Sequence, residues 1–150
     1  MLHKVARRVL SNILCNHLFP YAEKVTGNYQ CGFQLGGSTV SQIFTIRQIL
    51  EKTKEYNISL HHPFIGFQVA YDTITREKLF AAIKEFGYPG KLMRMVHPIM
   101  KYSTCSVRVQ SSLSAQFGTM NALRQGDVLA CLLFNVALEK VIQDSGIQTR

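Results

Sequence analysis

The chain has 150 residues, of which 47% are hydrophobic and 17% charged, so it suits one globular domain and is not a disordered chain. Its 17 Lys and Arg residues exceed its 9 Asp and Glu residues and give a formal charge of +8. That charge favours a polyanionic partner, and a basic surface that only keeps the protein soluble is the alternative. No apolar run approaches the ~20 residues of a membrane span, which argues against a transmembrane protein and a membrane partner.

The cysteines indicate the compartment. They have neither the CxxC spacing nor the Cys/His grouping of a zinc site, and they favour free thiols in a reducing compartment. We therefore expect an intracellular protein, nuclear or cytoplasmic and not secreted. Residues 1–22 are basic, free of acids and apolar at near-helical spacing, so a mitochondrial presequence is the alternative to an ordinary amphipathic helix.

The first third of the chain predicts two helices. One runs from the N-terminus to about residue 19, where Pro20 is expected to stop it. A glycine-rich loop follows as far as residue 38. Ser38 or Thr39 then caps a second helix that reaches Tyr56 and carries one broad apolar face.

The middle of the chain predicts a strand followed by a helix. Residues 63–70 are rich in aromatic and β-branched types, which predicts a strand buried on at least one side. Its apolar side chains are expected in the core, and they are Phe64, Ile65, Phe67 and Val69. A helix is predicted to begin near residues 72–75 and to end at about residue 86, with Gly87 as its left-handed cap.

The last third predicts a helix, a hairpin and a final helix. Residues 91–100 have a helical pattern that should end or kink near His97, because Pro98 interrupts it. Residues 104–109 and 115–120 predict two strands of a hairpin. Asp127 begins a largely buried last helix. The whole order is that of a mixed α+β fold, mainly helical with a short antiparallel sheet, and has too few strands for a doubly wound sheet.

Six sequence blocks together resemble the reverse transcriptase domain of non-LTR (LINE-like) retrotransposons, over about residues 5–147. The blocks are Tyr29–Phe33, Phe64–Asp72, Arg76–Leu79, Val107–Val109, Leu123–Asp127 and Leu133–Asn135. The resemblance implies that residues 1–150 form the fingers and part of the palm of a right-hand polymerase that copies RNA into DNA with Mg²⁺. The later hairpin with its Asp-Asp pair and the thumb are expected to lie outside this segment, which leaves a palm edge that a partner could cover.

The resemblance also predicts a defective metal site. It places Gly66 where the family has a metal-binding Asp, and glycine offers no oxygen ligand to Mg²⁺. Two-metal catalysis needs carboxylates that bridge ions about 3.5–4 Å apart. The chain has three aspartates, no two of them adjacent: Asp72, Asp127 and Asp144. We therefore expect a degenerate, catalytically inactive fragment with no intact catalytic residue, no metal ligands and no bound cofactor.

Other residues match the family's nucleotide pocket, and the resemblance makes them a vestigial binding set: Phe67, Tyr71, Gln125 and Gly126. Tyr71 matches the residue that screens the sugar 2′ position, and a core aromatic is the alternative. Gln125 and Gly126 match the pocket loop, and the alternative is a loop that leads into a helix capped by Asp127.

Nucleic-acid contacts are predicted more weakly. Lys101, Arg108 and Arg124 are candidates for binding a phosphate backbone of RNA or DNA, and solvated cations are the alternative. Residues 34–39 lack the cations that the family usually has after the Gly-Phe pair. Two other functions therefore stay open, a nucleic-acid-binding module without catalysis and a mobile-element remnant without function.

Overall fold

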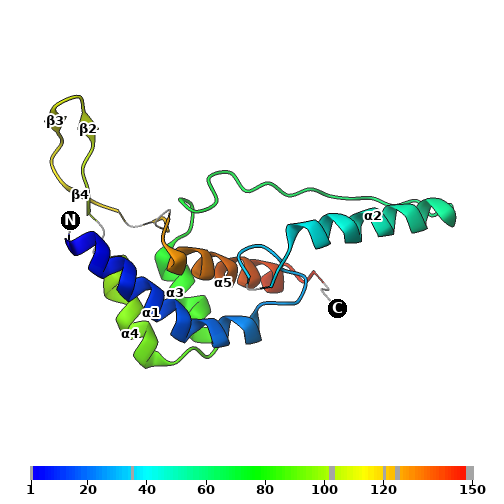
Figure 1. The fold of residues 1–150 in the computed structure, drawn as a ribbon, viewed down its shortest axis with the longest axis horizontal. Helices are drawn as coiled ribbons and strands as arrows, with labels where there is room; N and C mark the ends of the chain where they lie inside the picture. The colour runs from blue at the N-terminus through cyan, green and yellow to red at the C-terminus, as the bar shows by residue number, and fades with distance from the viewer. Residues whose placement is uncertain (1, 35, 102–103, 120, 124–125, 148–150) are drawn as a thin grey trace. The chain divides into compact units, whose positions relative to one another are not determined.

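A computed structural model describes residues 2–34, 36–101, 104–119, 121–123 and 126–147. Its helices are α1 (Leu2–Val25), α2 (Thr39–Glu55), α3 (Arg76–Glu85), α4 (Gly90–Lys101) and α5 (Val128–Asp144) (Figure 1). Its strands are β1 (Thr104–Cys105), β2 (Arg108–Val109), β3 (Ser112–Leu113) and β4 (Phe117–Gly118). This is the expected α+β class, mainly helical. The chain divides into a main unit, Met1–Gly27 with Val69–Arg150, and a small unit, Asn28–Gln68.

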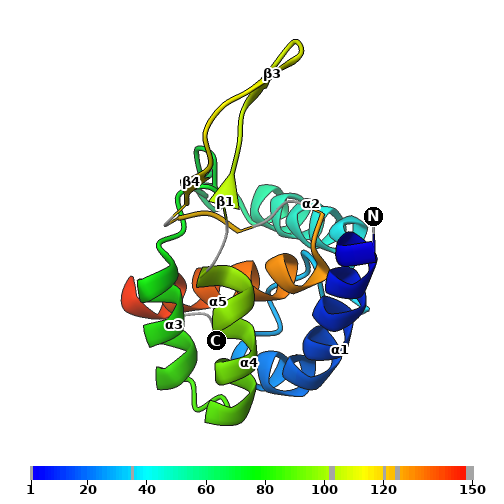
Figure 2. The same ribbon diagram turned by 90° about the vertical axis from the view of Figure 1, so that its left-hand side faces the viewer.

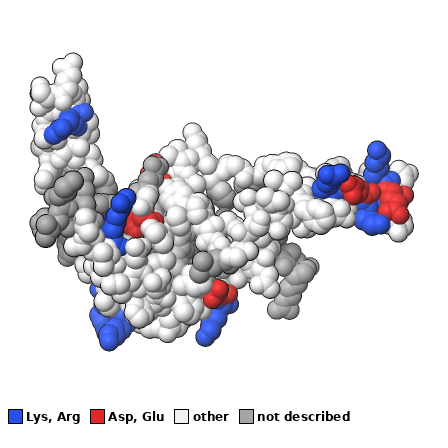
Figure 3. Space-filling model, in the orientation of Figure 1, with Lys and Arg blue, Asp and Glu red and all other residues white. Residues whose placement is uncertain are grey.

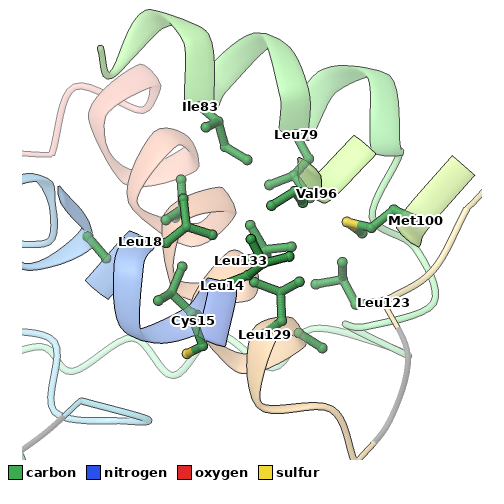
Figure 4. Packing of buried hydrophobic residues seen from close by; sticks show 14 of the residues in the cluster. Leu14, Cys15, Leu18, Leu79, Ile83, Val96, Met100, Leu123, Leu129 and Leu133 are labelled. Carbon is green, nitrogen blue, oxygen red and sulfur yellow. The ribbon is translucent and has the colours of Figure 1, made fainter. Parts of the chain in front are cut away.

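Helices α1, α3, α4 and α5 form the core of the main unit. Helix α1 packs against α4 and α5, and α3 packs against the same two helices (Figure 2). Leu14 and Leu18 of α1 meet Leu133 of α5 in the centre, where all three are at most 2% exposed (Figure 4). Ile83 and Val96 close the same core from α3 and α4 and are fully buried. The last helix is largely buried, as its many apolar positions predict.

Two prolines lie inside helices, so the helix end predicted at Pro20 is wrong, and the helix predicted to end or kink near His97 does not end there. Helix α1 continues through Pro20 to Val25, and α4 continues through Pro98 to Lys101. Buried residues flank each proline on both sides, and they are Leu18 and Ala22 for the first, Val96 and Met100 for the second. The packing of both flanks offsets the ~3 kcal/mol that an interior proline costs a helix.

A hairpin is present as predicted, in the form of an interrupted antiparallel ladder, but its returning arm begins at Ser112, before the predicted residue 115. Thr104 pairs with Gly118 between β1 and β4, and Arg108 pairs with Leu113 between β2 and β3. The side chains of all four strands are exposed. The hairpin therefore extends from the main unit without joining a larger sheet within the described residues. Residue 120, the end of the second predicted strand, lies outside those residues.

The small unit consists of a loop, α2 and an extended segment. Ser38 caps α2 as predicted, because its hydroxyl accepts a hydrogen bond from the Ser41 N–H at 3.4 Å. No residue of α2 is buried, so the predicted apolar face meets no core in this unit. Figure 3 shows Lys, Arg, Asp and Glu side chains gathered towards the end of this helix. They include the ion pairs Arg47–Glu51 and Lys52–Glu55, which are exposed and contribute little stability.

The predicted strand at residues 63–70 is not formed. Residues 61–67 have no regular secondary structure, and residues 68–72 form a turn. Phe64 is 87% exposed, and Ile65, Phe67 and Val69 are also exposed, so the expectation that they are core residues is wrong. A strand needs neighbours for its backbone groups, and none of the described residues pairs with this segment. Val69 also has φ of +48°, a left-handed value that ends an extended run.

We expect proteases to cleave the small unit first. Its helix buries no side chain, so it opens locally at lower free energy than the packed helices of the main unit. Under limiting trypsin the earliest cuts should follow Arg47, Lys52 or Lys54, as mass spectrometry of the fragments can determine. Early cleavage after Lys84 or Arg94 instead would contradict the difference in packing.

A buried hydroxyl in the main unit can be removed without a loss in the free energy of unfolding. Tyr88 is 6% exposed, and its hydroxyl has no hydrogen-bond partner among the described residues. Burial raises the pKa of Tyr88, so the group stays a neutral phenol. Because an unsatisfied buried hydroxyl is unfavourable, Tyr88→Phe should leave the free energy of unfolding unchanged or raise it by up to ~1 kcal/mol. Urea unfolding measures this, and a loss above ~1 kcal/mol would reveal a partner for the hydroxyl.

Candidate functional site

The start of α5 lies beside one of the blocks singled out in the sequence. Gly126 has φ of +77°, a conformation that favours glycine, and Asp127 follows as the N-cap of α5. Its carboxylate accepts a hydrogen bond from the Leu129 N–H at 3.1 Å and another from the Ser11 hydroxyl at 3.0 Å. The cap predicted at Asp127 is therefore confirmed, and it also ties α1 to the start of α5.

Arg76 holds the segment that leads to this loop. Its side chain is 9% exposed, and its Nε donates to the Ala122 carbonyl at 3.2 Å. Its two terminal nitrogens donate to the carbonyl and the hydroxyl of Thr119. Backbone bonds add to this clamp, because the Leu123 N–H donates to the Tyr71 carbonyl at 2.9 Å and the Ala122 N–H to the Ile74 carbonyl at 3.1 Å. The bonds thus fix Tyr71, Ile74 and Arg76 to Thr119, Ala122 and Leu123.

These elements line a half-open pocket of about 310 Å³, which we call the Arg76 pocket. Charged residues of both signs line it together with apolar side chains such as Leu133. The charged residues are Arg7, Arg76, Asp72 and Asp127. Arg7 donates to the Ile99 carbonyl at 3.0 Å, so this cation also braces α1 against α4. With two cations and two anions in its lining, the pocket has polar groups for a small ligand but no net charge to attract one.

Tyr71 lies in the main unit as a packed aromatic. Its ring stacks on Phe134 with centroids 4.7 Å apart, and its hydroxyl donates to the Cys131 sulfur at 3.8 Å. Burial, with a contribution from Cys131, raises the pKa of Tyr71 to about 12. These contacts match the alternative of a core aromatic, and whether the residue also faces a sugar stays a prediction.

The remaining predicted site residues are distributed over both units. Gly66 and Phe67 belong to the small unit, where both are exposed. Lys101 at the end of α4 and Arg108 on β2 are exposed in the main unit, and Figure 3 shows a cation on the hairpin. Arg124 and Gln125 lie outside the described residues. Their predicted roles, and that of Gly126, remain predictions.

Sequence reasoning missed the residues that build the Arg76 pocket from a distance. Ser11 and Arg7 come from the first helix, and no local pattern connects them with Asp127 or α4. The sequence marks Arg76 only as part of a block, and it offers no sign that this side chain binds backbone carbonyls 43 and 46 residues away.

The described residues offer little for metal binding or for catalysis by a thiol. Within the described residues no three His, Cys, Asp or Glu side chains are placed to hold a metal ion together. All four cysteines are free, as predicted. Burial raises the pKa of the Cys15 thiol, and nearby Asp127 and Cys131 raise it further, so Cys15 is a neutral thiol and a poor nucleophile.

A family model described as reverse transcriptase (RNA-dependent DNA polymerase) matches residues 1–147. The chain belongs to the reverse transcriptase family. Membership implies a polymerase-like fold and makes RNA and DNA the expected ligands, in agreement with the charge of +8. Every helix of the described residues is too short or too polar to cross a membrane.

Proposed function

We propose that this chain is a fingers-and-palm segment of a non-LTR retrotransposon reverse transcriptase that no longer polymerises DNA. The observation that carries the proposal is Gly66, which stands at the family's metal-binding Asp position. The non-LTR assignment is supported by six sequence blocks in the family's order. An intracellular location, nuclear or cytoplasmic, goes with this assignment.

The residues present do not fit the two Mg²⁺ ions of an active polymerase. Gly66 has no donor atom, and the chain has no adjacent pair of aspartates. Asp127, the last residue of one of the six blocks, already caps α5 and accepts a bond from Ser11. Without carboxylates that bridge two ions, the attacking and leaving oxygens of nucleotide addition lack their charge stabilisation.

Primer extension tests the proposal directly. The purified chain is incubated with a labelled primer on an RNA template, all four deoxynucleotides, and Mg²⁺ or Mn²⁺. We expect no product above a heat-treated control. Extension that co-purifies with the chain, and that is abolished by chelation, would overturn the claim of inactivity.

The substitution Gly66→Asp is the matched variant for that assay. A Cβ at Gly66 would meet no heavy atom within 4 Å, so the variant should fold with its stability changed by less than ~0.5 kcal/mol. Because the chain supplies no Asp-Asp pair, we expect the single substitution to leave primer extension absent. Thermal unfolding and the extension assay measure the two expectations. Restored synthesis would show that the other metal ligands are in place after all.

A second function, nucleic-acid binding without catalysis, is favoured by exposed cations of the main unit. Lys101 and Arg108 are exposed at the end of α4 and on the hairpin. Binding to an RNA–DNA hybrid should weaken steeply with salt, because each phosphate contact releases counterions. A binding constant that is flat from 50 to 200 mM salt would exclude this function.

The third reading, a remnant that needs a partner or has no function, is supported by the small unit. Its exposed apolar side chains include Phe44, Phe64 and Ile65. Such a surface favours aggregation unless another protein covers it. A soluble monomer with one cooperative thermal transition would contradict this reading.

A further inference from the structure

A second depression lies between α3 and α4, on a different part of the main unit from the Arg76 pocket. It has a volume of about 420 Å³ and shares no lining residue with that pocket. Its lining combines cations with rings and apolar groups, namely Phe80, Lys84, Tyr88, Met93, Arg94 and His97. Figure 2 shows the two helices that form it side by side. Its volume lies within the ~300–1,000 Å³ typical of ligand sites.

The charge of this depression is uniformly positive. Lys84 and Arg94 are exposed, and within the described residues neither makes an ion pair. None of the lining residues is acidic. The nearby Glu85 carboxylate is already bound to Lys140 at 2.7 Å. Two cations without protein partners around one hollow favour an anionic ligand.

The start of α4 adds to the positive potential at the same place. Gly90, the first residue of α4, also lines the depression, and a Cβ there would lie 4.0 Å from Nη1 of Arg94. The Arg94 guanidinium therefore lies over the first turn of the helix. That turn contains no acidic residue, so its backbone N–H dipoles and the guanidinium act on the same anion.

Two neighbouring rings also line the depression. Phe80 and His97 have ring centroids 4.9 Å apart with planes tilted by 46°. Phe80 is partly buried and packs against the core, so its ring is held in place. Tyr88 also lines the depression, and its buried hydroxyl has no partner among the described residues. A planar ring with an attached anion matches this pairing of an aromatic surface with cations, and a nucleotide is such a group.

We propose that this depression binds single-stranded RNA or DNA, with one base on Phe80 and His97 and the neighbouring phosphate between Lys84 and Arg94. The site is independent of the polymerase centre, since none of its lining residues belongs to the six family blocks. It gives the chain a nucleic-acid contact that the loss of metal ligands leaves intact. Because it uses no residue of the primer-extension argument, either proposal can fail without the other.

Fluorescence anisotropy with a labelled dodecauridylate tests the proposal on the full chain. The double variant Lys84→Gln/Arg94→Gln should lower the slope of log affinity against log salt by about 1.4, because each cation–phosphate contact with a single strand contributes about 0.7. Phe80→Leu should weaken binding by about 5- to 150-fold through lost stacking. The matched control is Arg8→Gln/Lys78→Gln, which removes the same charge from exposed positions outside both pockets and should keep the slope.

Crosslinking locates the contact even where Phe80→Leu fails to fold. A 5-iodouridine oligonucleotide irradiated on the wild-type chain should attach to the tryptic peptides 79–84 or 95–101, which contain Phe80 and His97. Attachment elsewhere would overturn the proposal. An equal effect of the control double variant would do the same, because binding would then depend on overall charge alone. Displacement of the oligonucleotide by polyglutamate of equal charge would point to an acidic protein segment and also overturn it.

Discussion

Replacing Leu133 by alanine should lower the free energy of unfolding by about 3–5 kcal/mol. Leu133 is 2% exposed and packs in the centre of the main unit, beside Leu14 of the first helix (Figure 4). Truncation removes buried methyl groups and leaves a cavity where α1 and α5 meet, and among the described residues no other two helices pack together as extensively. Domains of this size have only about 5–15 kcal/mol of stability, so the variant should be near its unfolding threshold at 37 °C.

Urea unfolding followed by circular dichroism measures this loss. Val141→Ala is the matched control, because Val141 lies on the same helix with 54% of its surface exposed. It should change the stability by less than ~0.5 kcal/mol. Equal losses in the two variants would mean that α5 is not packed as described.

The ends of helices could be predicted from the sequence where a capping residue marks them. Ser38 and Asp127 each precede a helix and accept a hydrogen bond from one of its first N–H groups. Gly87 has φ of +75°, the left-handed conformation expected after the end of α3. These signals involve residues within one turn of each other, so they do not depend on the rest of the fold.

The helix ends expected at the prolines and the strand expected at residues 63–70 are absent. Whether a helix continues or a strand forms depends here on residues far away in the sequence. Pro20 and Pro98 would end isolated helices, but buried neighbours on both sides keep the helices together. The aromatic and β-branched composition of residues 63–70 fits a half-buried pleated surface, and such a surface exists only where other strands supply it. In the described residues nothing pairs with this segment.

The sequence predicts the loop and the helix cap of the candidate site. It does not predict which distant residues contact them. The contact of Ser11 with Asp127 joins residues 116 positions apart, and that of Arg76 with Thr119 joins residues 43 positions apart. Serine and arginine are common surface residues, so their types alone give no reason to place them inside. Their burial is meaningful only once the partner carbonyls and carboxylate are known.

Arg76→Met should lower the free energy of unfolding by about 2–4 kcal/mol, and it should loosen residues 119–123 before the helices. Methionine keeps much of the packing volume but donates no hydrogen bond, so the carbonyls of Thr119 and Ala122 lose a charged donor in a half-buried place. Arg76→Lys should recover only part of the loss, because one ammonium cannot reproduce the planar fork of the guanidinium. Lys78→Met on the exposed side of α3 is the control and should cost less than ~0.5 kcal/mol.

Hydrogen exchange of the Ala122 and Leu123 amides, which donate to Ile74 and Tyr71, reports the local loosening. Unchanged protection of these two amides in Arg76→Met would show that the backbone bonds hold the segment without the side chain.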